Sequence, residues 1–414
     1  MQLLIPESRI VFASFFIFGL LNNILYVVIL SAAIDLVGSA TPKATVLLAD
    51  IIPSFTIKVM APFFVGLISY RTRIWMLVGL SSFGMLVISL TSDESINAKI
   101  VGICMASLSS GLGEVTFLQL THFYQREYSI SGFSSGTGGA GLLGSFVFML
   151  LTNMLGMKVW VVLLLFAVLP LGFLMAFYVM LPKARGGGGD EPGYEALDSL
   201  DERSDPSSNA SFSSSQTVSL KGHVVSTIKN ILPLIRPYML PLCLVYVSEY
   251  IINQGISPTL LFPLDELPHW LFSSYRDIYV VYGFMYQLGV FVSRSSISFG
   301  IRIKRLYLLS VLQFANVVIT VYQSVHDKPF SSVWLLLALI FYEGLLGGFS
   351  YVNTFMSVSE EVSKSKREFS MGCVGISDTF GILLAGCINW SLEPHLCSLQ
   401  VNRGRDWCLN GGSA

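Results

Sequence analysis

Eleven apolar stretches, each long enough to cross a lipid bilayer as a helix, occupy most of this 414-residue chain. A helix needs about 20 apolar residues to span the hydrocarbon core, and inside a bilayer only helices or closed barrels satisfy the backbone. Barrel strands would appear as alternating segments of about ten residues, whereas these stretches are longer and continuous. Because 53% of the residues are hydrophobic and only 12% are charged, the sequence predicts an all-α polytopic membrane protein.

The expected spans fall into two groups separated by one long polar segment. The spans are residues 10–34, 44–68, 74–90, 100–120, 133–155, 159–181, 239–262, 278–299, 306–322, 333–358 and 369–390. We therefore expect a six-helix half at 1–181, a polar loop at 182–236, a five-helix half at 237–391 and a tail at 392–414. The first span is too long for a signal-peptide core, and no small-residue cleavage site follows it, so we expect it to remain as a helix.

The basic residues predict the orientation of the chain. Most of the 25 Lys and Arg residues fall in segments that share a side with the N-terminus, and the basic loops of membrane proteins face the cytosol. We therefore expect a cytosolic N-terminus, a cytosolic central loop and a tail on the opposite side. Cys397 and Cys408 share that tail and can form a disulfide if the tail faces an oxidising lumen.

The central loop begins with the composition of a disordered segment. Gly186 to Gly189 lead into a run rich in Ser, Asp and Glu that continues to Ser215, and such segments bury too little apolar surface to fold. Tyr194 and Leu197 form a Tyr-x-x-apolar pattern there, which vesicle adaptor proteins read as an endolysosomal sorting signal. Short patterns of this kind also arise by chance, so the sorting signal and its adaptor partners are a hypothesis.

The two halves resemble each other at a nearly constant sequence offset. Three pairs of polar residues occupy matching places, namely Asn23 and Asn253, Arg71 and Arg302, and Glu114 and Glu343. Because six intervening helices preserve the direction of crossing, the repeats are parallel, as are the two halves of a major-facilitator transporter. The sequence therefore predicts a major-facilitator-like fold with about 11 transmembrane helices in two pseudo-repeated halves. Coincidence of the three pairs is the alternative.

Seven charged side chains lie inside the expected spans, where each costs roughly 2.5–3.5 kcal/mol on insertion scales. They are Asp50, Lys58, Glu114, Glu249, Arg294, Glu343 and Asp378. Counting along each span places Lys58, Glu249 and Glu343 near the middle of the bilayer and the other four nearer its surfaces. A chain that keeps this many charges in the membrane is expected to use them on something polar.

We interpret these charges as the lining of a polar cavity between the halves. Lys58 and Arg294 would bind an anionic or phosphate-bearing substrate, the arginine through its bidentate fork. Glu249 and Glu343 would take up and release protons. The candidates for proton coupling, packing or gating near a mouth of the cavity are Asp50, Glu114 and Asp378. The alternative is internal ion pairing, which would stabilise helix packing without touching a substrate.

Four amides are uncharged candidates for the same cavity. They are Asn22 and Asn23 in the first span and Asn253 and Gln254 in the seventh. An amide in a membrane helix hydrogen-bonds either a ligand or a neighbouring helix, and the sequence leaves both alternatives open.

Other classes of function have little support in the sequence. The run from Gly136 to Gly141 formally satisfies the dinucleotide fingerprint, but that fingerprint requires a preceding strand, and this run opens a membrane span. We interpret it as small residues that let two helices approach closely. The five His residues are scattered, so we expect no metal site. The net charge of −1 suggests no nucleic-acid partner, and we expect neither a cofactor nor enzymatic activity.

Seven segments resemble the battenin family of lysosomal membrane proteins, which is linked to juvenile neuronal ceroid lipofuscinosis and has fungal vacuolar relatives. They are GLLNNILYVV at 19–28, LLAD at 47–50, SSGTGGAGLLG at 134–144, EYIINQG at 249–255, GVFVSRSS at 289–296, YEGLLGG at 342–348 with YVNT at 351–354, and ISDT at 376–379. They run in family order from the first span to the last. The central loop departs from the family in lacking an acidic dileucine signal, and the tail after Cys397 also looks unlike the usual C-terminus.

The resemblance implies a major-facilitator-like protein of lysosomal, late endosomal or vacuolar membranes. The family is associated with the clearance of glycerophosphodiesters from the lysosome, with lysosomal pH, with basic amino-acid handling and with vesicle trafficking. Our leading hypothesis is a proton-influenced exporter of glycerophosphodiesters, because the single negative charge of a phosphodiester requires a cation such as Lys58 or Arg294. The alternatives are a basic amino-acid (arginine) transporter and a non-transporting scaffold that recruits trafficking proteins through its central loop.

Overall fold

The computed structural model describes residues 7–32, 36, 44–91, 95–155, 157–182, 220–269, 271–272 and 275–410. Within these ranges all regular secondary structure is helical, which confirms the all-α prediction. The sorting pattern at Tyr194 and Leu197 lies outside the described residues, as does most of the central loop. The interpretation of that pattern therefore stays a hypothesis.

The described helices belong to two groups in chain order. The first group consists of α1 (Glu7–Ser31), α3 (Ala44–Phe64), α4 (Tyr70–Leu90), α5 (Ile96–Leu120), α6 (Arg126–Met149), α7 (Val159–Phe166) and α8 (Leu171–Leu174). The second consists of α9 (Leu220–Leu234), α10 (Leu240–Tyr250), α11 (Tyr275–Arg294), α12 (Leu306–His326), α13 (Val333–Glu361), α14 (Lys364–Val374), α15 (Ile376–Val401) and α16 (Trp407–Asn410). Short 3₁₀ and π turns join several of these into longer helical segments.

Ten helical segments of the described chain are long and apolar enough to cross a membrane. They match every expected span except residues 278–299, which correspond to α11. Tyrosines and charged residues at the start of α11 lower its hydropathy, yet α11 packs against α6 and α13 inside the bundle. The expected span 278–299 is therefore occupied by a helix of the bundle, although the composition of α11 as a whole does not mark it as a membrane helix.

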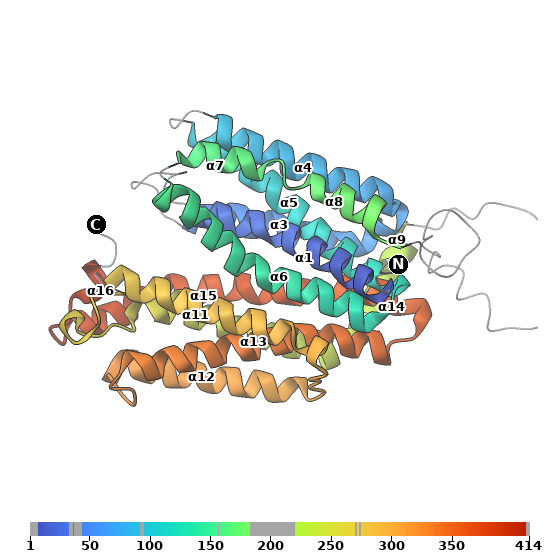
Figure 1. The fold of residues 1–414 in the computed structure, drawn as a ribbon. Helices are drawn as coiled ribbons and strands as arrows, with labels where there is room; N and C mark the ends of the chain where they lie inside the picture. The colour runs from blue at the N-terminus through green and yellow to red at the C-terminus, as the bar shows by residue number, and fades with distance from the viewer. Residues whose placement is uncertain are drawn as a thin grey trace, which may run out of the picture.

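The two groups of helices form two layers that run side by side along the length of the molecule (Figure 1). Helix α1 begins at one end of the bundle, beside α9 and α14, and α16 lies at the opposite end. A chain whose first and last helices lie at opposite ends has crossed the bundle an odd number of times. This arrangement agrees with eleven crossings.

Helix α6 joins the layers because glycines on two of its faces let different helices approach. A side chain at Gly132 or Gly136 would collide with the backbone of α1, and a side chain at Gly141 would collide with Gln287 of α11. Glycine at these positions lets three helices approach closely. The close-packing interpretation of the run from Gly136 to Gly141 is thus confirmed.

Two expected boundaries are wrong. Residues 220–234 form helix α9, although we assigned them to the loop, and the last span continues to Val401 rather than ending near residue 390. Apolar residues such as Val224, Ile228 and Ile231 recur at helical spacing in α9, which explains why this end of the loop is folded. Pro394 is accommodated inside the extended last helix.

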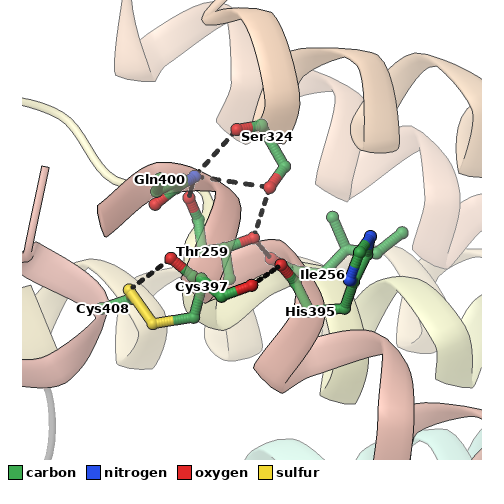
Figure 2. Close-up of a disulfide and its surroundings, with 8 residues drawn as sticks. Ile256, Thr259, Ser324, His395, Cys397, Gln400 and Cys408 are labelled. Carbon is green, nitrogen blue, oxygen red and sulfur yellow. Dashed lines mark hydrogen bonds between the residues drawn. A yellow bond between two sulfur atoms is a disulfide. The ribbon is translucent and has the colours of Figure 1, made fainter. Parts of the chain in front are cut away.

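A disulfide closes the tail against the last membrane helix. Cys397 and Cys408 are bonded, with their Cα atoms 5.8 Å apart. Beside them, the amide of Gln400 donates to the carbonyl oxygens of Thr259 (2.7 Å) and Ser324 (2.8 Å), as Figure 2 shows. Because disulfides persist in oxidising compartments, this bond agrees with the expectation that the tail lies on the side opposite the cytosol.

We expect the disulfide to be detectable by thiol counting. In protein denatured without reductant, only the four free cysteines (Cys104, Cys243, Cys373 and Cys387) should react with a maleimide. All six should react after reduction, whereas the C397S/C408S double variant should show four in both conditions. Loss of an 11-residue cross-link should cost about 2–3 kcal/mol of stability. Six reactive thiols before reduction would show that the tail is not oxidised.

Candidate functional site

Lys58 of α3 is held by two carboxylates at the contact between the halves. Its Nζ lies 2.6 Å from Oε2 of Glu114 on α5 and 3.3 Å from Oδ1 of Asp378 on α15. It also donates to the hydroxyl of Thr379 at 2.6 Å. The Lys58 side chain is only 3% exposed. We call Lys58, Glu114 and Asp378 the lysine triad, and it connects two helices of the first half to one of the second.

The lysine triad carries more acid than base. With all three groups ionised, two carboxylates face one ammonium, and the local net charge is negative. Tyr351 of α13 also donates to Oε1 of Glu114 at 3.2 Å. In this conformation Lys58 is therefore neutralised and closed off from solvent, which favours internal ion pairing over anion binding for this residue.

The expected difference in depth within the lysine triad is wrong. We expect Glu114 and Asp378 nearer the bilayer surfaces than Lys58, but direct contact puts the three charged groups at one level. The reason is that helix lengths differ from the lengths of the apolar stretches. Asp378 lies well inside the helical segment Lys364–Val401, which begins and ends beyond the expected span.

Arg294, at the end of α11, lies in a different environment. Its guanidinium donates to the hydroxyl of Thr137 on α6 at 2.6 Å and to that of Tyr246 on α10 at 2.9 Å. It also lies over the ring of Tyr351, 4.3 Å from the centroid. Within the described part of the chain no carboxylate lies within ion-pairing distance of it, and its Nε has no hydrogen-bond partner. Arg294 is thus a partly buried cation held by neutral groups from both halves.

Glu249 and Glu343 form an acidic pair in the second half. Glu249 of α10 accepts a hydrogen bond from the hydroxyl of Tyr286, and Glu343 of α13 accepts one from the amide of Asn253 at 3.0 Å. They are 2% and 1% exposed. Each keeps one buried oxygen (Oε2) that has no hydrogen-bond partner among the described residues. A negative charge on such an oxygen is costly, and protonation removes that cost.

Tyr351 connects the lysine triad to Arg294. Its hydroxyl donates to Glu114, and its ring packs under the Arg294 guanidinium. Tyr246, which accepts from Arg294, lies one helical turn before Tyr250, and their rings are stacked at 6.2 Å. The lysine triad and Arg294 therefore belong to one cluster, with Tyr351 between them.

The remaining candidates have mainly structural contacts. Asn22 donates from α1 to the carbonyl of Ser110 on α5 at 3.0 Å, whereas Asn23 donates within its own helix. Asn253 holds Glu343, and Gln254 lies partly buried in the π-helical turn Ile251–Ile256. Asn23 and Asn253, which the offset pairs, each donate to the backbone carbonyl four residues earlier, at 3.2 and 3.1 Å.

Asp50 is buried near the other end of α3, away from the lysine triad. Its backbone oxygen accepts from the Ser107 hydroxyl, and its Oδ2 has no hydrogen-bond partner in the described part of the chain. Among the described residues, no group of three or more His, Cys, Asp or Glu side chains is arranged to hold a metal ion.

Comparisons with known proteins identify the family. The model of the CLN3 protein family matches residues 13–399. The chain is 63% identical to Protein BTN1 of Candida albicans over 99% of both chains, and 45% identical to Protein BTN1 of Saccharomyces cerevisiae over 97% of this chain and 98% of that one. The chain belongs to the CLN3 protein family. The resemblance to battenin is thereby confirmed.

Solved structures confirm the fold. The human organic anion transporter MFSD10 (TETRAN) superposes with a TM-score of 0.62 at 13% identity, covering 99% of this chain and 97% of that one. A bacterial homologue of the iron transporter ferroportin gives 0.59 at 13% identity, covering 99% and 100%. The Escherichia coli fucose:proton symporter FucP gives 0.56 at 13% identity, covering 98% and 95%. The family member described here is a multi-pass membrane protein with the major-facilitator fold.

Sequence reasoning missed the neutral partners of the ions. Thr137, Tyr246, Tyr286 and Tyr351 each bond to a buried charged group. Thr137 lies in the glycine-rich run, where it is the one hydroxyl between Gly136 and Gly138. A hydroxyl within a close-packed helix face, and tyrosines within a turn or two of intramembrane charges, are the signals that could have revealed them.

Proposed function

We propose that the protein is a lysosomal or vacuolar transporter that exports glycerophosphodiesters from the lumen to the cytosol and thereby influences luminal pH. The observation that carries this proposal is Arg294, a cation between the halves that is held by hydroxyls and a ring instead of a carboxylate. The membrane topology, the family and the major-facilitator fold support a transporter in general. The substrate is argued from the site.

A phosphodiester suits the surroundings of Arg294. One negative charge would match one guanidinium, and the planar fork of arginine binds phosphate oxygens through two parallel hydrogen bonds. The hydroxyls of Thr137 and Tyr246, which now accept from Arg294, would be free to bond the glycerol hydroxyls once the phosphate takes their place. Lys58 is the weaker anion-binding candidate, because two carboxylates already neutralise it.

Proton movement would be the task of Glu249 and Glu343. Both side chains are buried, and each has an oxygen without a partner, so each is more easily accommodated when protonated. When the site opens to water, the ionised form becomes acceptable and the proton can leave. A transporter that exchanges solvent access between lumen and cytosol would in this way couple solute export to luminal acidity.

The lysine triad would act as a latch between the halves. Lys58 on α3 reaches Asp378 on α15, so rocking of the second half against the first must stretch or break this contact. Glu114 stays with Lys58 on the first half and would keep the lysine neutralised while the latch is open.

Basic amino-acid transport is the second candidate, and the negative excess of the lysine triad favours it. An arginine or lysine substrate could bind Glu114 and Asp378 in place of Lys58, and Arg294 would then have a structural role. A non-transporting scaffold would depend on the central loop, including Tyr194 and Leu197, which lies outside the described residues.

Uptake by proteoliposomes distinguishes these candidates. Liposomes that contain the purified protein should take up radiolabelled glycerophosphocholine and glycerophosphoglycerol. Uptake should be faster when the pH differs across the membrane, and arginine should not be taken up. Uptake of arginine without either phosphodiester would support the second candidate. Transport of neither class by well-folded protein would contradict the transporter proposal and favour the scaffold.

A further inference from the structure

A cavity of about 580 Å³ lies in the second half, between the loop that precedes α12 and the segment that joins α9 to α10. Its walls include Tyr238, Lys304, Arg305, Tyr307 and Glu361. The hydroxyl of Tyr307 donates to the carbonyl of Arg236 at 2.6 Å, which connects the two sides. This cavity is on the same end of the bundle as α9 and the start of α1 (Figure 1), which we assign to the cytosol.

Two cations of the cavity have no ion-pair partner among the described residues. Lys304 and Arg305 are exposed, and neither forms an ion pair within the described ranges. Their neighbour Arg302 is different, because it pairs with Glu360 at 3.2 Å and also donates to Asn353 at 2.7 Å.

One acidic side chain and the N-terminus of one helix also contribute to the charge of the cavity. Glu361 is the one carboxylate in the cavity wall, and it already accepts a hydrogen bond from Tyr238 at 2.8 Å. Helix α12 begins at Leu306, and its first turn adds the partial positive charge of a helix N-terminus. The mouth of the cavity is therefore suited to an anion.

The surface beside these cations is apolar. Leu308 in the cavity wall is 48% exposed, and Val311, three residues further along α12, is 64% exposed. In a membrane protein such side chains face lipid. The cations thus lie at the boundary between acyl chains and cytosol. A free anion would contact only the charged part of this surface, whereas a phospholipid would contact both the charged part and the apolar part.

We propose that this cavity binds the headgroup of an anionic phospholipid from the cytosolic leaflet. The phosphate groups would lie against Lys304, Arg305 and the first turn of α12, and the acyl chains would lie along Leu308 and Val311. Basic pockets between transmembrane helices on the cytosolic side recognise such lipids through their headgroup charge. The site is separate from Arg294 and does not depend on the transported substrate.

The test measures the thermal stability of the purified full chain in detergent, titrated with dioctanoyl phosphatidylinositol 4-phosphate. Dioctanoyl phosphatidylcholine and inorganic phosphate serve as the neutral-lipid and free-anion arms. The test variant is K304A/R305A, with K304Q/R305Q as a substitute that keeps more of the side-chain volume. The matched control is R9A/K364A, which removes one arginine and one lysine that are exposed on the same end of the bundle.

The anionic lipid should raise the unfolding temperature of the parent protein and of the control variant, and the neutral lipid should not. Removing two cations should weaken the apparent affinity for the anionic lipid about 25-fold, since each Lys or Arg near an anionic surface contributes about fivefold. An unchanged affinity in both K304A/R305A and K304Q/R305Q would overturn the proposal. An equal stabilisation by inorganic phosphate would identify a free-anion site in its place.

Discussion

Replacing Arg294 with alanine should reduce glycerophosphocholine uptake by proteoliposomes roughly 100-fold or more. Hydrogen bonds to charged groups contribute about 1.5–3 kcal/mol each, and the substitution removes the two that the guanidinium would make to the phosphate. The protein should still fold, because the partners that lose Arg294 are the neutral hydroxyls of Thr137 and Tyr246. These hydroxyls can bond water or nearby carbonyls after the change.

Two further variants separate charge from geometry at this position. Arg294→Lys keeps the positive charge and loses the planar fork, so it should retain a small part of the uptake with a raised KM. Arg9→Ala removes an exposed arginine at the start of α1 and should leave uptake unchanged. Normal transport by Arg294→Ala, in protein that elutes as a single species, would show that the anion binds elsewhere.

Glu249→Gln tests proton coupling at the same site. The amide imitates the protonated carboxyl, so the variant should still bind a phosphodiester while its uptake loses the dependence on a pH gradient. Uptake that follows the gradient as steeply as in the parent protein would exclude Glu249 from the proton path and leave Glu343 as the candidate.

Replacing Lys58 with methionine should destabilise the protein by about 3–5 kcal/mol. The change leaves Glu114 and Asp378 buried without their cation, and the loss of one partner from a buried ion pair has a cost of this size. We expect a lower unfolding temperature and a lower yield of folded protein. The measurement is the unfolding temperature of the purified protein in detergent, followed by tryptophan fluorescence.

The triple variant K58M/E114Q/D378N tests whether the loss of stability in Lys58→Met arises from unpaired buried charge. It removes the ammonium and both carboxylates together, so no buried charge is left unpaired, and most of the lost stability should return. If the triple variant is as unstable as Lys58→Met, the contribution of Lys58 is packing, and the latch interpretation fails. If Lys58→Met itself is as stable as the parent, the lysine triad does not hold the halves together.

The relation between sequence and structure is clearest at α6 and at α11. The glycine run of α6 was interpreted correctly from sequence, because a row of small residues in a membrane span has few uses other than close helix approach. The span 278–299 was expected and is occupied by α11, although its composition alone does not mark it as a membrane helix. The prediction rested on the apolar stretch 278–299, which begins after Arg276 and Asp277. These two charged residues lie inside α11 and lower its mean hydropathy.

The sequence predicted which charged residues belong to the candidate site, but it predicted only part of the contacts between them. An intramembrane charge is visible in sequence because it interrupts an apolar stretch, so Lys58, Arg294 and the carboxylates were all found. Their partners were not found, because Lys58 meets Asp378 across a sequence separation of 320 residues. The periodicity of apolar residues describes one helix at a time, and it does not show which face of that helix packs against which other helix.

The sequence by itself determined where the chain crosses the bilayer, which charges it carries into the hydrocarbon and which family it resembles. These properties follow from local composition, because the transfer of each segment into lipid depends on its own side chains. Only the tertiary structure decided that Lys58 is neutralised by two acids while Arg294 is held by hydroxyls. That difference arises from the packing of helices remote in sequence, and it makes Arg294 the better candidate for binding an anionic substrate.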